Sequence, residues 1–157
     1  MASGVLRASL RIDRPIAEVF EFFSRAENLG AITPPELGFE IRTPLPVAMH
    51  PGALIDYAIR LHGIPMRWQT LITAWNPPHE FVDEQLRGPY AEWIHTHRFR
   101  ADGPGATIIE DEVRYRLPLG PLGSLVHPLV RRQLDRIFSY REAAVRRRLS
   151  AAALPAA

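Results

Sequence analysis

The N-terminal residues alternate between apolar and polar side chains, and this alternation predicts a strand. Over residues 5–13 every second side chain is apolar, which is the pattern of a half-buried strand. Residues 16–23 then carry apolar side chains at helical spacing. One or two short helices are therefore expected next, with Asp13 as a cap and Pro15 in the first turn. The prolines within residues 33–35 break any helix and predict a loop.

Strand-like runs fill the middle of the chain and are separated by short turns rich in glycine and proline. Consecutive strands with such short connections indicate an antiparallel meander and argue against βαβ units. A short strand is expected at residues 39–42, and five longer runs lie at residues 53–62, 66–75, 80–87, 90–100 and 107–117.

After Pro118 the apolar period lengthens to between three and four residues, which predicts a long amphipathic helix. The helix extends over about twenty residues or more, on the order of 30 Å. Its arginines lie mostly outside the apolar stripe and are expected to face solvent. We expect the stripe to face the sheet, and its members are Leu122, Leu125, Val126, Leu129, Leu134, Ile137, Phe138 and Val145.

Length and composition are those of one globular domain. The chain has 157 residues, of which 46% are hydrophobic and 23% are charged, and this length can bury a core without disulfides or metals. We predict a single domain over residues 1–150 and a flexible C-terminal tail over residues 151–157. No apolar run approaches a membrane span and the N-terminus lacks a signal-peptide layout, so we expect a cytoplasmic protein without integral membrane association.

The sequence contains no cysteine and no lysine. The lack of cysteine excludes disulfides, thiol nucleophiles and cysteine-ligated zinc or iron–sulfur sites. The lack of lysine excludes Schiff-base catalysis and a phosphate-binding P-loop. A formal net charge of +2 gives little support for nucleic-acid binding. We predict no cofactor and no nucleic-acid partner, and a protein that is either a monomer or a homodimer.

The order of the elements predicts an α+β fold with a strand, two short helices, an antiparallel meander and one long C-terminal helix. A curved sheet with an apolar face must cover that face, and one helix covers it incompletely. The remaining space is expected to form a concave, mostly apolar cavity, which is the usual shape of a small-molecule site.

Three stretches of the sequence resemble a known superfamily. They are residues 12–23 (IDRPIAEVFEFF), residues 81–99 (FVDEQLRGPYAEWIHTHRF), and residues 115–123 (YRLPLGPLG) with residues 137–141 (IFSYR). The chain resembles the START and birch-pollen-allergen superfamily (SRPBCC), in particular its bacterial ligand-binding and polyketide cyclase/dehydratase-like members. The resemblance implies a helix-grip fold, with a curved antiparallel sheet wrapped around the C-terminal helix and a hydrophobic ligand between them.

Because strand side chains alternate between the two faces, apolar residues that point inward bring polar neighbours with them. Trp93 and Phe99 on the inner face place His95 and His97 there too. The same reasoning predicts a polar wall formed by Asp83, Gln85, His95, His97, Asp111 and Tyr115. The candidate ligand-binding residues are Tyr57, Ile59, Trp68, Phe81, Asp83, Gln85, Trp93, His95, His97, Phe99, Asp111, Tyr115, Leu134, Phe138 and Arg141.

Buried carboxylates need partners, so we expect Asp83 and Asp111 to pair with the histidines. Such pairs have three interpretations: general acid–base catalysis, a polar anchor for a ligand, or structure alone. The spacing of His95 and His97 also suits a metal ion, but the carboxylates are distant in sequence and we predict no metal site. The catalytic candidates are these two histidines and two aspartates, and no role is assigned to any of them.

The leading functional hypothesis is non-enzymatic binding of a lipid, an isoprenoid or quinone, or an aromatic polyketide. If Arg141 reaches inward beside Phe138, it favours an anionic group on the ligand. A second hypothesis is a cyclase, dehydratase or isomerase that uses the histidines and aspartates for proton transfer. A third is a co-chaperone-like interaction module, which would have a filled interior and an exposed apolar patch.

Overall fold

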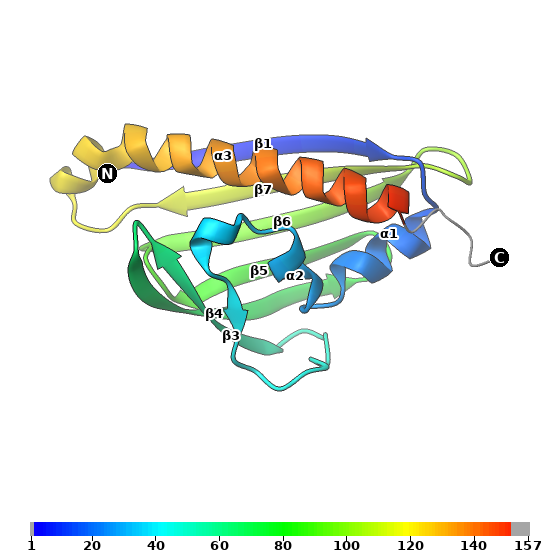
Figure 1. The fold of residues 1–157 in the computed structure, drawn as a ribbon, viewed down its shortest axis with the longest axis horizontal. Coiled ribbons are helices and arrows are strands. Elements are labelled where there is room, and N and C mark those ends of the chain that lie inside the picture. Colours follow the sequence, from blue (N-terminus) through cyan, green and yellow to red (C-terminus); the bar gives the residue numbers. More distant parts are fainter. Residues whose placement is uncertain (1, 152–157) are drawn as a thin grey trace.

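The structure, a computed structural model, describes residues 2–151, so the predicted tail beyond Ala151 lies outside the described residues. The strands form one antiparallel sheet in the order β1-β7-β6-β5-β4-β3-β2 (Figure 1). The predicted meander is therefore confirmed. The strands are β1 (Ser3–Ile12), β2 (Glu40–Ile41), β3 (Leu54–Leu61), β4 (Ile64–Asn76), β5 (Glu80–Arg87), β6 (Glu92–Ala101) and β7 (Thr107–Arg116).

The first strand pairs with the last one, and the chain then crosses to the opposite edge of the sheet. β1 lies antiparallel to β7, and the crossing segment contains α1 (Ile16–Phe23), α2 (Asn28–Ala31) and the short 3₁₀ helix η1 (Pro35–Leu37) before β2. The expected cap is wrong, because Pro15 occupies the N-cap position of α1 and no side chain caps the helix. Asp13 is instead an exposed partner of Arg11.

The β3–β4 connection is tighter than expected. The sequence predicts a turn at residues 63–65, but the turn residues are His62 and Gly63, both with positive φ (50° and 80°). This is the two-residue hairpin geometry that matches the twist of the flanking strands. Register shifts along β4 between Gln69 and Thr70 and again between Ile72 and Ala74 add local twist and help curve the sheet.

The long helix α3 (Pro121–Ala151) runs for 31 residues and lies along β1 and β7 on the concave side of the sheet (Figure 1). Its C-terminal part packs into the main core, where Ala144 and Val145 are each 1% exposed and join a cluster around Phe20. Leu134 joins a second cluster with Leu6 and β7 residues. Within residues 2–151, no helix is both long and apolar enough to cross a membrane.

The N-terminal third of α3 departs from the prediction that the whole apolar stripe is buried. Leu122, Leu125, Val126 and Leu129 are 61%, 77%, 45% and 54% exposed. The helix starts only a few residues after β7 ends at Arg116, so its first turns stand at the end of the sheet with little surface beneath them (Figure 1). We refer to these four side chains as the exposed helix patch.

The exposed helix patch should contribute little to the stability of the monomer. Replacing Leu125 with glutamine is expected to change the free energy of unfolding by less than about 0.5 kcal/mol, because surface substitutions away from packed contacts have effects of this size. Urea denaturation measures the change. The same substitution at the buried Leu134 is the control, because it places an amide in the core. A clear loss of stability in the Leu125 variant would mean that this patch is covered in solution.

Candidate functional site

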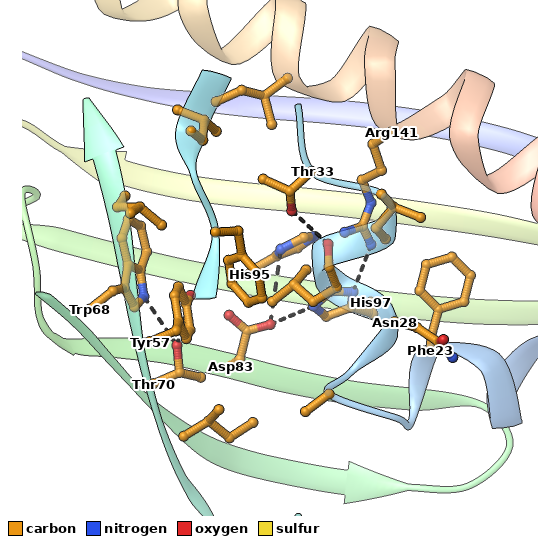
Figure 2. A pocket seen from close by; sticks show the side chains of 18 of the residues that line it. Phe23, Asn28, Thr33, Tyr57, Trp68, Thr70, Asp83, His95, His97 and Arg141 are labelled. Carbon is orange, nitrogen blue, oxygen red and sulfur yellow. Dashed lines mark hydrogen bonds and ion pairs between the residues drawn. The ribbon is translucent and has the colours of Figure 1, made fainter. Parts of the chain in front are cut away.

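A cavity of about 180 Å³ lies between α3 and the concave face of the sheet. Its walls come from β3, β4, β5 and β6, from α3, and from the segment that carries α1, α2 and η1 (Figure 2). Most of the lining side chains are apolar, and the polar ones include Tyr57, Thr70, Asp83, His95, His97 and Arg141.

Aromatic rings form one end of the cavity. Tyr57 and Trp68 stack with their ring centroids 5.8 Å apart, and Trp93 meets Trp68 edge to face at 5.3 Å. The Nε1–H group of Trp68 donates to Oγ1 of Thr70 at 3.1 Å, and the hydroxyl of Tyr57 lies 3.2 Å from the same oxygen. Burial raises the pKa of Tyr57, so its hydroxyl stays neutral. This end is aromatic and largely apolar.

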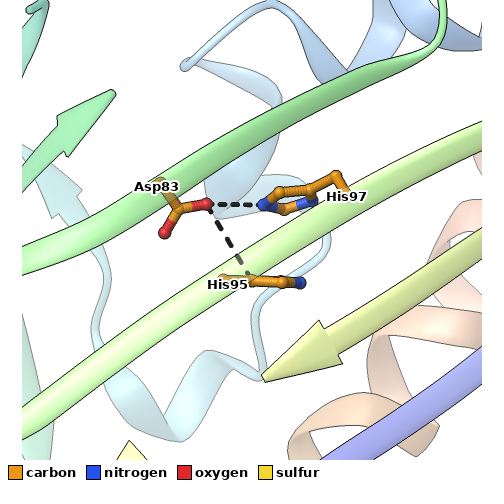
Figure 3. A group of neighbouring side chains, drawn as sticks. All are labelled: Asp83, His95 and His97. Carbon is orange, nitrogen blue, oxygen red and sulfur yellow. Dashed lines mark hydrogen bonds and ion pairs between the residues drawn. The ribbon is translucent and has the colours of Figure 1, made fainter. Parts of the chain in front are cut away.

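Two histidine–aspartate pairs form the opposite wall. In the β-sheet register Asp83 on β5 lies opposite His95 on β6, and Asp111 on β7 lies opposite His97. The hydrogen bonds run diagonally: Nε2 of His97 lies 2.5 Å from Oδ2 of Asp83, and Nε2 of His95 lies 2.7 Å from Oδ1 of Asp111. The two imidazole rings stack with centroids 3.6 Å apart. The expected pairing of aspartates with histidines is therefore present, and Figure 3 shows Asp83 beside both histidines.

Arg141 completes this wall from the helix side. It is 8% exposed and lines the cavity beside Phe138, so this arginine does reach inward. Its Nη2 atom lies 3.4 Å from Oδ1 of Asp111 and 3.5 Å from Nδ1 of His97. The guanidinium also lies over the ring of Phe23 at 5.2 Å, a cation–π arrangement. We refer to Asp83, His95, His97, Asp111 and Arg141 together as the His–Asp–Arg cluster.

The ionisation of the cluster follows from burial and from its opposite charges. Burial opposes ionisation of Asp111, but the charge of Arg141 and the hydrogen bond with His95 hold its pKa below the usual range. Burial also opposes ionisation of Asp83, yet its hydrogen bond and charge interaction with His97 lower its pKa. Burial dominates for His97 and lowers its pKa to about 4. When both imidazoles are neutral, two carboxylates and one guanidinium leave an excess of one negative charge.

The architecture matches that of solved structures over nearly the whole chain. A protein from Thermus thermophilus is 18% identical with a TM-score of 0.71, covering 96% of this chain and 99% of that one. The Zhui aromatase/cyclase from Streptomyces sp. R1128 is 14% identical with a TM-score of 0.76, covering 95% and 94%. A START superfamily protein from Mycobacterium smegmatis is 13% identical with a TM-score of 0.66, covering 90% and 96%.

The chain has the helix-grip, or SRPBCC, fold. No protein-family model and no curated protein matches the sequence. At these low identities the similarity establishes the fold alone, and site residues cannot be transferred from the neighbours. The chemistry of this helix-grip protein has to be argued from its own cavity.

Most of the predicted ligand-binding residues lie around the cavity. They come from four strands and from α3, which explains why only the folded chain brings them together. Those that line it are Tyr57, Ile59, Trp68, Phe81, Asp83, Trp93, His95, His97, Leu134, Phe138 and Arg141.

Four predicted residues do not line the cavity. Gln85 holds the β5–β6 turn, since its amide nitrogen donates to the carbonyl of Tyr90 at 2.7 Å. Phe99 packs in the main core, and Asp111 lies behind the histidines. The hydroxyl of Tyr115 lies 2.9 Å from Nε2 of His127. The alternation of side chains predicted the correct face of the sheet for these residues. Away from the cavity, however, α3 and neighbouring segments pack directly against that face.

One wall of the cavity was missed by the sequence analysis. The segment between β1 and β3 contributes apolar and polar side chains that face the sheet across the cavity. Apart from the helical spacing of residues 16–23 and the short strand expected at residues 39–42, this segment has short helices and prolines in place of a regular period, so its pattern does not indicate which side chains point inward. Its lining residues are Phe22, Phe23, Arg25, Ala26, Asn28, Leu29, Ile32, Thr33, Leu37, Phe39, Ile41 and Met49.

Proposed function

We propose that this helix-grip protein binds a compact amphipathic molecule in its cavity. The proposal rests chiefly on one observation: the cavity is apolar and aromatic at one end, and four members of the His–Asp–Arg cluster line it next to these rings, namely Asp83, His95, His97 and Arg141 (Figure 2). A ligand that spans it would place rings against Trp68 and Trp93 and a polar group against the histidines. The neighbour described as an aromatase/cyclase is consistent with an aromatic ligand.

The size of the cavity limits the ligand. An apolar cavity of about 150 Å³ accepts a single benzene ring, and this one has about 180 Å³. One ring with substituents, or two fused rings, is therefore the expected size. A quinone head group or a small aromatic polyketide fits this range better than a whole lipid chain.

The polar group of the ligand should be neutral. Arg141 points inward, but Asp111 already matches its charge at 3.4 Å. The cluster carries an excess of one negative charge when the imidazoles are neutral, and a buried anion beside it would be costly. We therefore propose a hydroxyl or carbonyl group in place of the anionic group that Arg141 alone would favour.

Filling the cavity should abolish binding. Leu61 on β3 lines the cavity, and replacing it with tryptophan occupies space that the ligand needs. Isothermal titration calorimetry with 1-naphthol is expected to give a Kd on the order of 10 µM for the native protein, given the size of the ligand. Binding to the Leu61→Trp variant should be at least about tenfold weaker.

The matched control is Leu54→Trp, on the outer face of the same strand, where the side chain is 45% exposed. This variant should bind 1-naphthol like the native protein. Equal affinity in both variants would place the ligand outside the cavity. Naphthalene, which lacks the hydroxyl, should bind more weakly than 1-naphthol if the cluster anchors the polar group.

Proton-transfer catalysis is the second candidate, because His95 and His97 line the cavity and each contacts a carboxylate. A base next to a bound ketone would remove an α-proton. Deuterium exchange at the α-carbon of 2-tetralone in heavy water should then be faster with the native protein than in buffer. The His95→Gln and His97→Gln variants should lose this acceleration, and exchange at the native rate in both would leave binding as the function.

The open cavity argues against the co-chaperone alternative, which requires a filled interior.

A further inference from the structure

We propose that Asp83, His95 and His97 form a binding site for a divalent transition-metal ion. One oxygen of Asp83 and one nitrogen of each histidine lie within 4.8 Å of one another. All three side chains line the cavity, and two neighbouring strands hold them (Figure 3). To bind one ion at about 2 Å each, these three atoms would have to move closer together. Rotation of the three side chains can supply that movement.

The arrangement of the four imidazole nitrogens carries the proposal. One nitrogen of each ring faces Asp83: Nε2 of His97 at 2.5 Å and Nδ1 of His95 at 4.0 Å from Oδ2. The other nitrogen of each ring faces Asp111: Nε2 of His95 at 2.7 Å and Nδ1 of His97 at 3.5 Å from Oδ1. Asp83 therefore lies on the cavity side of both rings, and Asp111 lies on the far side.

For His95 this is the arrangement of a metal-binding histidine. A ligating imidazole binds the ion through one nitrogen and donates its other N–H to a carboxylate or carbonyl. Asp111 accepts from Nε2 of His95 at 2.7 Å and does not itself line the main cavity. It lies 3.5 Å from Nδ1 of His97, a nitrogen that Nη2 of Arg141 also approaches at 3.5 Å. Asp111 would orient His95, while Asp83 would serve as the third ligand. The ion would take the place of the Nε2 proton of His97, which would move to Nδ1 so that the imidazole stays neutral and faces Asp111 with an N–H group.

The charges also favour a cation at this position. Asp83 and Asp111 outweigh the single charge of Arg141 when the imidazoles are neutral, and the contacts of Arg141 are with Asp111 and the outer nitrogen of His97. A divalent ion would change the net charge of the cluster from one negative to one positive. Coordination of a hydroxide or of an ionised ligand oxygen would then bring the cluster to neutrality.

Two histidines and one carboxylate leave coordination positions open toward the cavity. This ligand set suits zinc, iron(II), cobalt(II) or nickel(II), and is less suited to calcium or magnesium, which prefer oxygen. Binding of the ion itself does not depend on the proposed organic ligand. Only one further point rests on the proposed function, namely that a hydroxyl or carbonyl of that ligand would occupy an open position and be polarised by the ion.

Cobalt(II) titration of the chelator-treated protein tests the site by calorimetry and visible absorption. The native protein should bind one ion per chain with a Kd on the order of 1 µM or tighter. Asp83→Asn and His97→Gln should weaken binding at least about 100-fold, and Asp111→Asn by about 10–100-fold as an outer carboxylate. His79→Gln, at an exposed histidine, is the matched control and should leave the affinity unchanged.

A second measurement on the native protein avoids the risk that a variant fails to fold. In ¹⁵N spectra of histidine side chains, zinc should shift Nδ1 of His95 and Nε2 of His97 and leave His127 unaffected. A Kd weaker than about 1 mM, or shifts confined to other histidines, would overturn the proposal. The Leu61→Trp variant should lose 1-naphthol binding and still bind cobalt. If the native protein binds 1-naphthol but does not bind cobalt, this inference fails while the proposed function stands.

Discussion

Replacing Arg141 with methionine is expected to lower the free energy of unfolding by about 3–5 kcal/mol, which is the usual cost of removing one partner from a buried ion pair. The guanidinium lies 3.4 Å from Asp111, and both side chains are only 10% exposed. Methionine has similar bulk and would fill the space between Phe23 and Phe138. The loss should therefore come mainly from the two carboxylates left without a cation, and urea denaturation at pH 7 measures it.

A double variant separates charge from packing. Adding Asp111→Asn to Arg141→Met removes the nearer of the two uncompensated carboxylates, and should recover about 1–3 kcal/mol, as expected for residues in direct contact. Arg146→Met on the same helix is the control, because its side chain is 53% exposed and its pair with Glu142 lies at the surface. That change should cost less than about 1 kcal/mol. A double variant no more stable than Arg141→Met would show that the cost is one of packing.

Acid should destabilise the metal-free protein through His97. Its pKa falls from 6.5 to about 4 on folding because the imidazole is buried. Between these two pH values the unfolded chain binds a proton that the folded protein does not, so stability decreases as pH falls. The difference in pKa corresponds to about 3 kcal/mol, lost between pH 6.5 and pH 4. Below that range Asp83 and Asp111, whose folded pKa values are lowered, add a further loss as they protonate.

Urea midpoints measured across this pH range, in buffer containing a chelator, test the assignment to His97. The His97→Gln variant keeps a donor for Asp83 but cannot titrate, so its stability should vary much less between pH 6.5 and pH 4. His79→Gln, at an exposed histidine, should keep the native profile. An unchanged profile in His97→Gln would mean that another group causes the acid sensitivity.

The sheet was predictable because its signals are local. Alternation placed β5 at residues 80–87 with the bounds that it has, and located β3, β4, β6 and β7 to within a few residues. The pairing of the two histidines with the two aspartates followed from their shared inner face. Each of these features depends only on the alternation of side chains along a strand and on the need of buried charges for partners.

The features that failed depend on distant parts of the chain. Leu125 has the spacing of a buried helix residue, but the sheet ends before it can cover that turn of α3. Tyr115 and Phe99 share the inner face with the histidines, yet α3 and α1 fill the space in front of them. Phe39 and Met49 line the cavity from a segment without a period. In each case tertiary packing, which the local sequence does not encode, decides the outcome.

Methyl NMR of isoleucine side chains during titration with 1-naphthol is the most direct test of ligand binding in the cavity. Ile55, Ile59, Ile72 and Ile137 line the cavity, whereas Ile64 lies outside it and is 59% exposed. The account predicts that the cavity methyl signals shift together and saturate with one ligand per chain, while the Ile64 signal stays in place. A saturating shift of the Ile64 signal with unmoved cavity signals, or no shift of any isoleucine signal, would contradict it.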